Sequence, residues 1–232
     1  MSLIKYNLND HMVEYDNGEF EVCYCLGNDY LHYIGNGKNI HNPKGNTSCY
    51  AMFHNFKGTS LDLLNFNTHN ITNMGSMFAN CSNLESLYLE NFDTHNVTGM
   101  SYMFSYCYNL KHLSLSKFKT SNVISMKSMF YNCENLKLLN ISQLNTENVL
   151  NMEGMFNKCK NLTELDISSF HFNDTTRLND MFWGCKNLET LKVDSDFFQY
   201  ISNHKYSLFK TCNGATIIPM SKLDKAVESL FY

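Results

Sequence analysis

Two histidines, His69 and His95, stand at equivalent positions of a repeated Thr-His-Asn phrase. Imidazole nitrogens are common ligands of zinc and other transition metals, so two of them on neighbouring repeats raise the possibility of a metal site. The next two repeats carry Ser121 and Glu147 at this position, and a metal site needs further ligands in a fixed geometry. Solvated loop residues are therefore the favoured interpretation, and the sequence predicts no metal site and no cofactor.

The nine cysteines are the second group with possible chemistry. Five of them stand three residues after a phenylalanine in successive repeats: Cys81, Cys107, Cys133, Cys159 and Cys185. Neighbouring rungs of a stack lie within the Cα separation that a disulfide permits, but five parallel, equivalent side chains cannot all pair. We expect buried free thiols, which suit a reducing compartment. The Cys23-x-Cys25 pair lacks a zinc-type spacing, and no chemistry is predicted for it or for Cys49 and Cys212.

The sequence contains no strong catalytic signature. A glycine-rich phosphate loop, a Gly-x-Ser-x-Gly elbow and a His-Glu-x-x-His motif are all missing, so no enzyme is predicted. Lys plus Arg number 18 against 22 Asp plus Glu, and without a basic excess we expect no nucleic-acid binding. No apolar run is long enough for a membrane span and no signal peptide is visible at the start, which favours an intracellular protein.

Internal repeats of about 26 residues must position all of these side chains. A Met-Phe pair marks each repeat, beginning at Met52, Met77, Met103, Met129, Met155 and Met181. The Leu-x-Leu pattern of Leu87 and Leu89 has the period of a strand, with both leucines pointing inward. The Met-Phe-x-x-Cys piece is too short for more than one helical or 3₁₀ turn.

A strict period of this length predicts a solenoid, because no single repeat can bury its own apolar face. Stacked repeats would place identical residues in ladders: the phenylalanines from Phe78 to Phe182, the cysteines from Cys81 to Cys185, and the asparagines from Asn83 to Asn187. Asparagine amides at the corners of the coils can bond backbone groups and one another. We therefore expect about six coils whose strands form a parallel sheet.

The outward strand positions vary while the framework repeats, which is typical of an extended binding face. Aromatic side chains often dominate interface energies, so Tyr88 and His112 are the predicted central contacts, with Leu138 beside them. The acidic residues predicted to flank them are Asp62, Glu90, Glu164 and Asp166. An ordinary hydrated surface is the alternative interpretation for each residue.

The phrase from Asn96 to Phe118, NVTGMSYMFSYCYNLKHLSLSKF, resembles the BspA-like branch of leucine-rich repeats. The resemblance covers about residues 50–194 and recurs in every repeat. It implies an α/β, arc-shaped leucine-rich solenoid dominated by its parallel sheet and used to bind other macromolecules. It also implies the cell surface, or secretion from the cell, as the alternative location.

The ends of a solenoid expose apolar faces and need caps. Residues 1–49 are predicted to form an N-terminal cap of β-hairpins, residues 50–194 the repeats, and residues 195–232 a C-terminal cap. The spacing of the apolar residues between 221 and 231 predicts an amphipathic helix in that last segment. Trp183 is predicted either to be an exposed anchor or to pack against this cap. The predicted function is a non-catalytic module for a protein partner; the alternative is an assembly protein that associates through its ends or edges.

Overall fold

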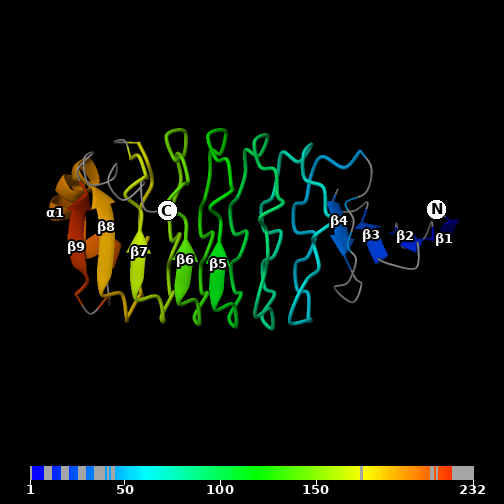
Figure 1. The fold of residues 1–232 in the computed structure, drawn as a ribbon, viewed down its shortest axis with the longest axis horizontal. Coiled ribbons are helices and arrows are strands. Elements are labelled where there is room, and N and C mark those ends of the chain that lie inside the picture. The colour runs from blue at the N-terminus through cyan, green and yellow to red at the C-terminus, as the bar shows by residue number, and fades with distance from the viewer. Residues whose placement is uncertain are drawn as a thin grey trace.

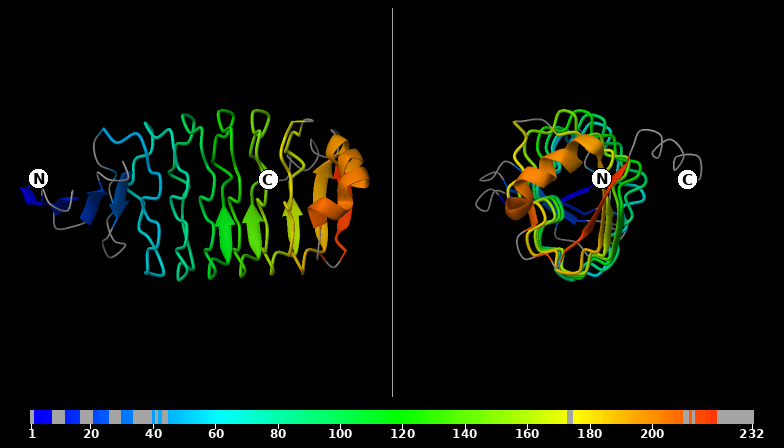
Figure 2. Two further views of the ribbon diagram at one scale, coloured as in Figure 1. Left: turned by 180° about the vertical axis from the view of Figure 1, so that it is seen from behind. Right: turned by 90° about the vertical axis from the view of Figure 1, so that its left-hand side faces the viewer.

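Successive repeats lie side by side along the long axis of the molecule (Figure 1). The computed structural model describes residues 2–7, 12–16, 21–25, 30–33, 40, 42, 45–172, 175–209, 212 and 214–220. Viewed from the end of the column, the coils overlie one another (Figure 2). The architecture is therefore a β-dominated stack of repeats, as the period predicts.

Parallel pairing joins equivalent residues on one side of the stack. β5 (His112–Ser114) pairs in parallel with β6 (Leu138–Asn140), and β7 (Glu164–Asp166) pairs with β8 (Thr190–Asp194). A second line of parallel bridges runs across six repeats through Ser48, Asn73, Gly99, Ser125, Asn151 and Arg177. Both lines keep one register, so like residues lie above one another.

The Met-Phe segment of each repeat is a chain of tight turns, within the limit of one helical or 3₁₀ turn that its length sets. The amide of Met77 donates to the carbonyl of Met74 at 3.2 Å, whereas the amide of Phe78 donates to Met103 in the next repeat at 2.9 Å. Residues two before and two after each phenylalanine have positive φ: Ala51, Asn55, Ser76, Asn80, Tyr102, Tyr106, Ser128, Asn132, Gly154, Lys158, Asp180 and Gly184. This backbone turns amides toward the neighbouring repeat, which a helix would have bonded internally.

The column is nearly straight in Figures 1 and 2, which corrects the arc that the family resemblance implies. An arc needs wider elements on one side of a stack than on the other. A helix is about 10–12 Å across, whereas hydrogen-bonded strands lie about 4.7–4.9 Å apart. Here hydrogen bonds join neighbouring repeats on the strand side and also along the Met-Phe segments, so both sides have a similar rise.

Stacked phenylalanines form the centre of the core. Phe104 lies 5.5 Å from Phe78 and 5.5 Å from Phe130, with ring planes within 7° and 3° of parallel. Phe156 continues the ladder at 5.6 Å from Phe130, and all four rings are fully buried. The ladder predicted from the Met-Phe spacing is therefore confirmed.

Buried threonines tie each repeat to the next. The hydroxyl of Thr94 donates to the carbonyl of Lys119 at 3.0 Å and accepts a bond from the Lys119 amide at 2.8 Å. Thr68 and Thr146 make the same pair of bonds with Asp93 and His171. Each hydroxyl therefore satisfies two backbone groups that the corner of the coil leaves without backbone partners.

The variant Thr94→Val is expected to lower the free energy of unfolding by about 1–3 kcal/mol, because valine keeps the volume and leaves two backbone groups of Lys119 unsatisfied. Chemical denaturation measures the change. Thr98→Val is the matched control, since Thr98 is exposed and its hydroxyl makes one bond, to Thr72. Equal losses for the two variants would contradict the role assigned to the buried hydroxyl.

The N-terminal strands form a separate antiparallel sheet in the order β1-β2-β3-β4. These strands are β1 (Ser2–Asn7), β2 (Met12–Asp16), β3 (Glu21–Cys25) and β4 (Tyr30–Tyr33). Neighbouring strands of this sheet pair in antiparallel fashion, as the β-hairpins predicted within residues 1–49 would. The ring of Tyr33 packs 5.2 Å from Phe53 and so covers the first rung of the phenylalanine ladder.

The stack continues beyond Asp194, where the period in the sequence ends. Helix α1 (Ser195–Phe209) follows β8, and β9 (Thr216–Met220) then pairs in parallel with β8. Phe209 stacks on Phe182 at 4.9 Å. The helix predicted between 221 and 231 lies outside the described residues. Within the described part of the chain, no helix has the length and apolar character needed to cross a membrane.

Candidate functional site

Outward strand positions make up one side of the stack, which we call the front face. Its members are Asp62, Leu64, Tyr88, Glu90, His112, Ser114, Leu138, Asn140, Glu164, Asp166, Thr190, Lys192 and Asp194. In β5, Leu113 is buried whereas His112 and Ser114 are exposed, and β6 repeats the pattern. The alternation predicted from Leu-x-Leu therefore holds, and it directs variable side chains to solvent.

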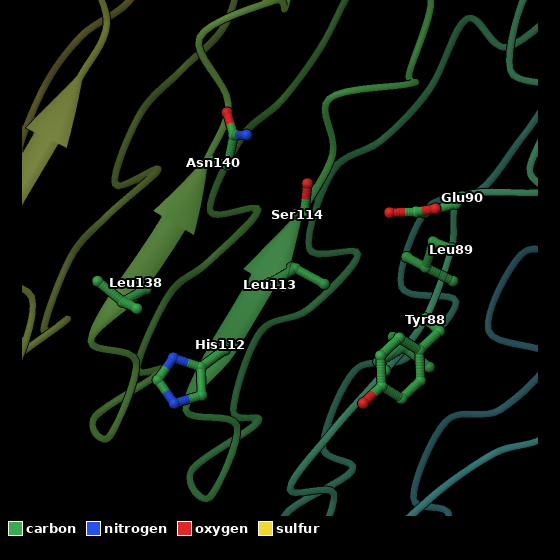
Figure 3. Close-up of a pocket in the computed structure, with 9 residues that line it drawn as sticks. Tyr88, Leu89, Glu90, His112, Leu113, Ser114, Leu138 and Asn140 are labelled. Carbon is green, nitrogen blue, oxygen red and sulfur yellow. The ribbon is translucent and has the colours of Figure 1, made fainter. Parts of the chain in front are cut away.

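Four of the seven predicted contact residues line one groove of about 300 Å³ (Figure 3). Tyr88 and Glu90 come from one repeat, His112 from β5 and Leu138 from β6. Tyr88 is 77% exposed and Leu138 is 63% exposed, so nothing in the described part of the chain covers either side chain. The groove therefore displays apolar surface that the core does not use.

A second groove of about 510 Å³ adjoins the first. His112 and Leu138 line both grooves, and the two residues are direct partners in the parallel pairing. Lys137, Thr163 and Glu189 are among the other residues of the second groove. The two hollows therefore meet at the His112 and Leu138 side chains.

The other three predicted contact residues lie outside both grooves. Asp62 and Glu164 are exposed on the front face. The Asp62 carboxylate accepts a bond from the Leu64 amide at 3.2 Å, and the Asp166 carboxylate accepts one from the Ser168 amide at 2.9 Å. Both aspartates thus stabilise the turn that follows their strand.

Leu64 was missing from the predicted contacts although it is 76% exposed. It stands one repeat before Glu90 in the outward stripe. A leucine at a position that points to solvent was the signal that could have identified it. Leu64, Tyr88 and Leu138 are the large apolar side chains displayed by the front face.

Carboxylates outnumber lysines on the front face and just before its strands. The carboxylates are Asp62, Glu85, Glu90, Glu164, Asp166, Glu189 and Asp194, and the lysines are Lys111, Lys137 and Lys192. Lys111 and Glu85 are in contact at 3.3 Å, with both side chains more than half exposed. The face therefore has an acidic character that favours basic partners.

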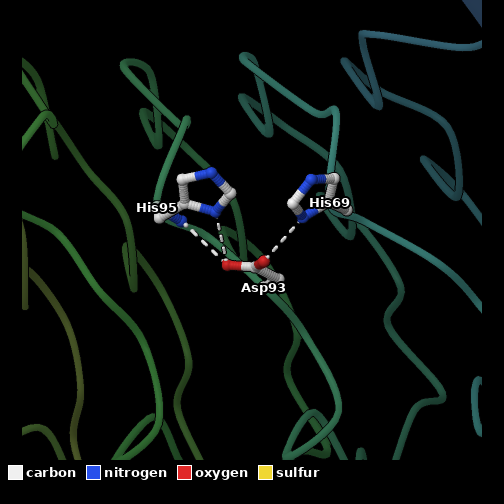
Figure 4. Close-up of side chains that lie close together, drawn as sticks. All are labelled: His69, Asp93 and His95. Carbon is white, nitrogen blue, oxygen red and sulfur yellow. Dashed lines mark hydrogen bonds and ion pairs between the residues drawn. The ribbon is translucent and has the colours of Figure 1, made fainter.

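The histidines predicted to be neighbours do meet, and an aspartate lies between them (Figure 4). Nδ1 of His69 lies 3.0 Å from Oδ2 of Asp93, and Nδ1 of His95 lies 2.7 Å from Oδ1. Hydrogen bonds from His95 and His69 lower the pKa of Asp93 to about 2, so the carboxylate is ionised at neutral pH. Asp93 was not among the predicted ligands, because the prediction compared only the coil position that the two histidines share on neighbouring repeats.

The ladder cysteines have neighbours that suppress thiol chemistry. The Sγ atoms of Cys81, Cys133 and Cys185 each donate to a phenylalanine carbonyl of the preceding repeat, at 3.0 Å. Burial raises the pKa of Cys133 to about 12. All seven cysteines from Cys49 to Cys212 are free, as the sequence predicts. The five ladder thiols from Cys81 to Cys185 are fully buried, so none of them is placed to act as a nucleophile.

Cys212 continues the cysteine ladder, although the sequence predicted no role for it. Its Sγ donates to the carbonyl of Phe182 at 2.9 Å. Trp183, the residue after Phe182, is half-buried, and the ammonium of Lys158 lies 5.1 Å from its ring centroid. Trp183 is thus packed by a neighbouring repeat.

Sequence comparison gives one family. A family model described as "Mycoplasma protein of unknown function, DUF285" matches residues 47–139 and again residues 113–216. The two matches overlap by about one repeat, as expected when a model of several repeats fits a periodic chain in two registers. No curated protein matches the chain.

Proposed function

Because the chain belongs to the DUF285 family, whose description assigns no activity, we propose its function from its geometry: a non-catalytic module that binds a protein partner on the front face. We also propose that the repeats form a leucine-rich solenoid of the BspA-like type, which the sequence resembles. The observation that carries the proposal is the groove in which Tyr88 and Leu138 stand largely exposed beside His112.

The stability of the fold does not depend on the exposed side chains of this surface, which leaves them available for binding. The inward positions of the repeats are occupied by buried apolar ladders, whereas truncating Tyr88 or Leu138 would remove little that the fold needs. Aromatic and apolar anchors in a hollow are the usual centres of binding energy. The acidic surroundings of the groove favour a partner segment that combines apolar or aromatic side chains with lysine or arginine.

An extended segment suits the shape of the site. The two grooves adjoin along the front face and share His112 and Leu138, so they form a trough across several repeats. We therefore propose that an extended loop or tail of a partner protein lies along this trough. The unpaired thiols support the further proposal that binding takes place in a reducing compartment.

The test selects ligands from a random peptide library with the full chain and measures their affinity by fluorescence anisotropy. The double variant Tyr88→Ala, Leu138→Ala is expected to weaken binding by at least about tenfold. The matched control is Ile124→Ala, Leu150→Ala, which removes two apolar side chains that are 50% and 49% exposed but lie outside both grooves.

The outcome separates two functions. Selected peptides that are basic and aromatic, and that lose affinity only with the groove variant, support the proposal. Peptides that bind the groove variant as tightly as the unchanged chain would argue against this face. Association through ends or edges is the second function, and sedimentation of the unchanged chain at increasing concentration would reveal it.

A further inference from the structure

We propose that His69, Asp93 and His95 form a binding site for a zinc ion that joins two neighbouring repeats. One ring nitrogen of each histidine and a carboxylate oxygen of Asp93 all lie within 4.8 Å of one another, and each Nδ1 lies within 3.0 Å of an Asp93 oxygen. In a tetrahedral zinc site with bonds of 2.0–2.1 Å, ligand atoms stand about 3.3 Å apart. Small rotations of these partly exposed side chains close the difference.

Among the described residues, two histidines and an aspartate come together at this one place in the stack. The position of His69 and His95 is taken by Ser121 and Glu147 in the next two repeats. The position of Asp93 is taken by asparagine, lysine, asparagine and histidine in the other repeats: Asn67, Lys119, Asn145 and His171. A carboxylate between two imidazoles is therefore a departure from the repeat and not a product of it.

The backbone beneath the cluster is held in place by neighbouring repeats. The buried hydroxyl of Thr68 bonds both the amide and the carbonyl of Asp93, at 2.8 and 2.9 Å. The side chain of Asn96 donates to the carbonyl of His69 at 3.0 Å, and that of Asn122 donates to the carbonyl of His95 at 2.6 Å. All three ligands thus stand on fixed main-chain positions, which lowers the cost of ordering them around an ion.

The chemistry of the donors fits zinc. Two imidazole nitrogens and one carboxylate oxygen are ligands that zinc accepts, and a fourth position is left for water. In the present arrangement each Nδ1 carries a proton shared with the carboxylate. A shift of that proton to Nε2 turns the two Nδ1 lone pairs toward the ion without any change in charge of the imidazole. The ionised carboxylate supplies the negative charge.

His69 belongs to one repeat, whereas Asp93 and His95 belong to the next. The ion would therefore link two rungs on the flank of the stack. The site is also distinct from the front face, because none of its ligands lines either groove.

The experiment titrates zinc chloride into the full chain under reducing conditions and follows the histidine ring signals by NMR. Signals of His69 and His95 are expected to shift together and to saturate at one equivalent, and a chelator should reverse the shift. The variant Asp93→Asn, which keeps the volume, is expected to weaken this binding by at least about tenfold. His171→Asn is the matched control, because His171 is exposed and stands outside the cluster.

Site-resolved signals are needed because other histidines and cysteines of the chain can also bind zinc. The proposal would be overturned if zinc shifted the signals of other residues but not those of His69 and His95. It would also be overturned if zinc shifted the His69 and His95 signals equally in the unchanged chain and in Asp93→Asn. Circular dichroism of each variant checks the fold. Should Asp93→Asn fail to fold, His69→Asn gives the same test, since His69 is exposed.

Discussion

Replacing Phe130 by alanine is expected to lower the free energy of unfolding by about 3–5 kcal/mol. The ring is fully buried and stacks on Phe104 at 5.5 Å and on Phe156 at 5.6 Å. Its removal takes away contacts on both sides and leaves a cavity in the middle of the column. The backbone amide of Phe130 is bonded to Met155 and cannot move into that space without breaking the ladder.

Urea denaturation followed by circular dichroism and by the fluorescence of Trp183 measures this loss. Trp183 is the single tryptophan and reports on the C-terminal repeats, so a transition seen at different urea concentrations by the two probes would show that the cavity uncouples the two halves of the stack. Tyr88→Ala is the control, an exposed aromatic residue whose removal should change stability by about 0.5 kcal/mol or less. A loss for Phe130→Ala as small as the control would contradict the role of the ladder.

The stacked core could be predicted because its cause lies in spacing alone. When Met-Phe recurs every 26 residues, identical side chains meet whatever the detailed backbone is, and the ring contacts from Phe78 to Phe182 follow. The chain of asparagine amides is a second example. Asn161 donates to Asn135 at 3.1 Å and Asn187 donates to Asn161 at 3.3 Å, as expected for stacked corners.

The backbone of the Met-Phe segment could not be predicted in the same way. Tyr102 and Tyr106 have φ of 60° and 61°, a region that bulky residues avoid at a cost of about 1–3 kcal/mol. The hydrogen bonds to the next repeat outweigh this preference. Those bonds form only between stacked repeats. The conformational preference of each residue alone therefore cannot predict them.

The C-terminal part of the stack could not be predicted from the period, because the spacing between equivalent residues changes there. Phe209 and Cys212 preserve the Phe-x-x-Cys motif, but they follow Phe182 and Cys185 by 27 residues instead of 26. Helix α1 fills the interval, and a local signal for it was present: the carboxylate of Asp194 accepts a bond from the Phe197 amide at 2.7 Å, as an N-cap does. Asp194 also fits the outward position of the preceding strand. Its presence alone therefore did not distinguish a helix N-cap from a strand residue.

The two candidate sites differ in how many of their residues could be predicted from the sequence. Tyr88, His112 and Leu138 fell into one groove because alternation in a strand fixes which side chains point outward. The carboxylate of Asp93 escaped prediction because it lies two residues before His95 along the chain, at a different rung position. Which corner side chains turn toward each other depends on rotamers and not on the period.

Removal of one whole repeat, residues 105–130, is expected to leave a folded protein, whereas removal of residues 105–117 is expected to abolish cooperative folding. The first deletion joins Phe104 to Tyr131, which stands where Ser105 stood in the repeat. Phe104 would then stack on Phe156, and the hydroxyl of Thr94 would meet Asn145. Every interface between repeats is replaced by an equivalent one, because each repeat contacts only its neighbours.

The half-repeat deletion has no such replacement. It sets the Met-Phe segment of one repeat against the strand of the next, so buried apolar positions face solvent and the parallel bridges through Gly99 and Ser125 lose their register. Circular dichroism, thermal unfolding and resistance to protease compare the two deletions with the unchanged chain. The shorter deletion removes fewer residues and fewer core side chains. If it were the better tolerated of the two, stability would follow the amount of chain kept, and register between repeats would not be what holds the stack together.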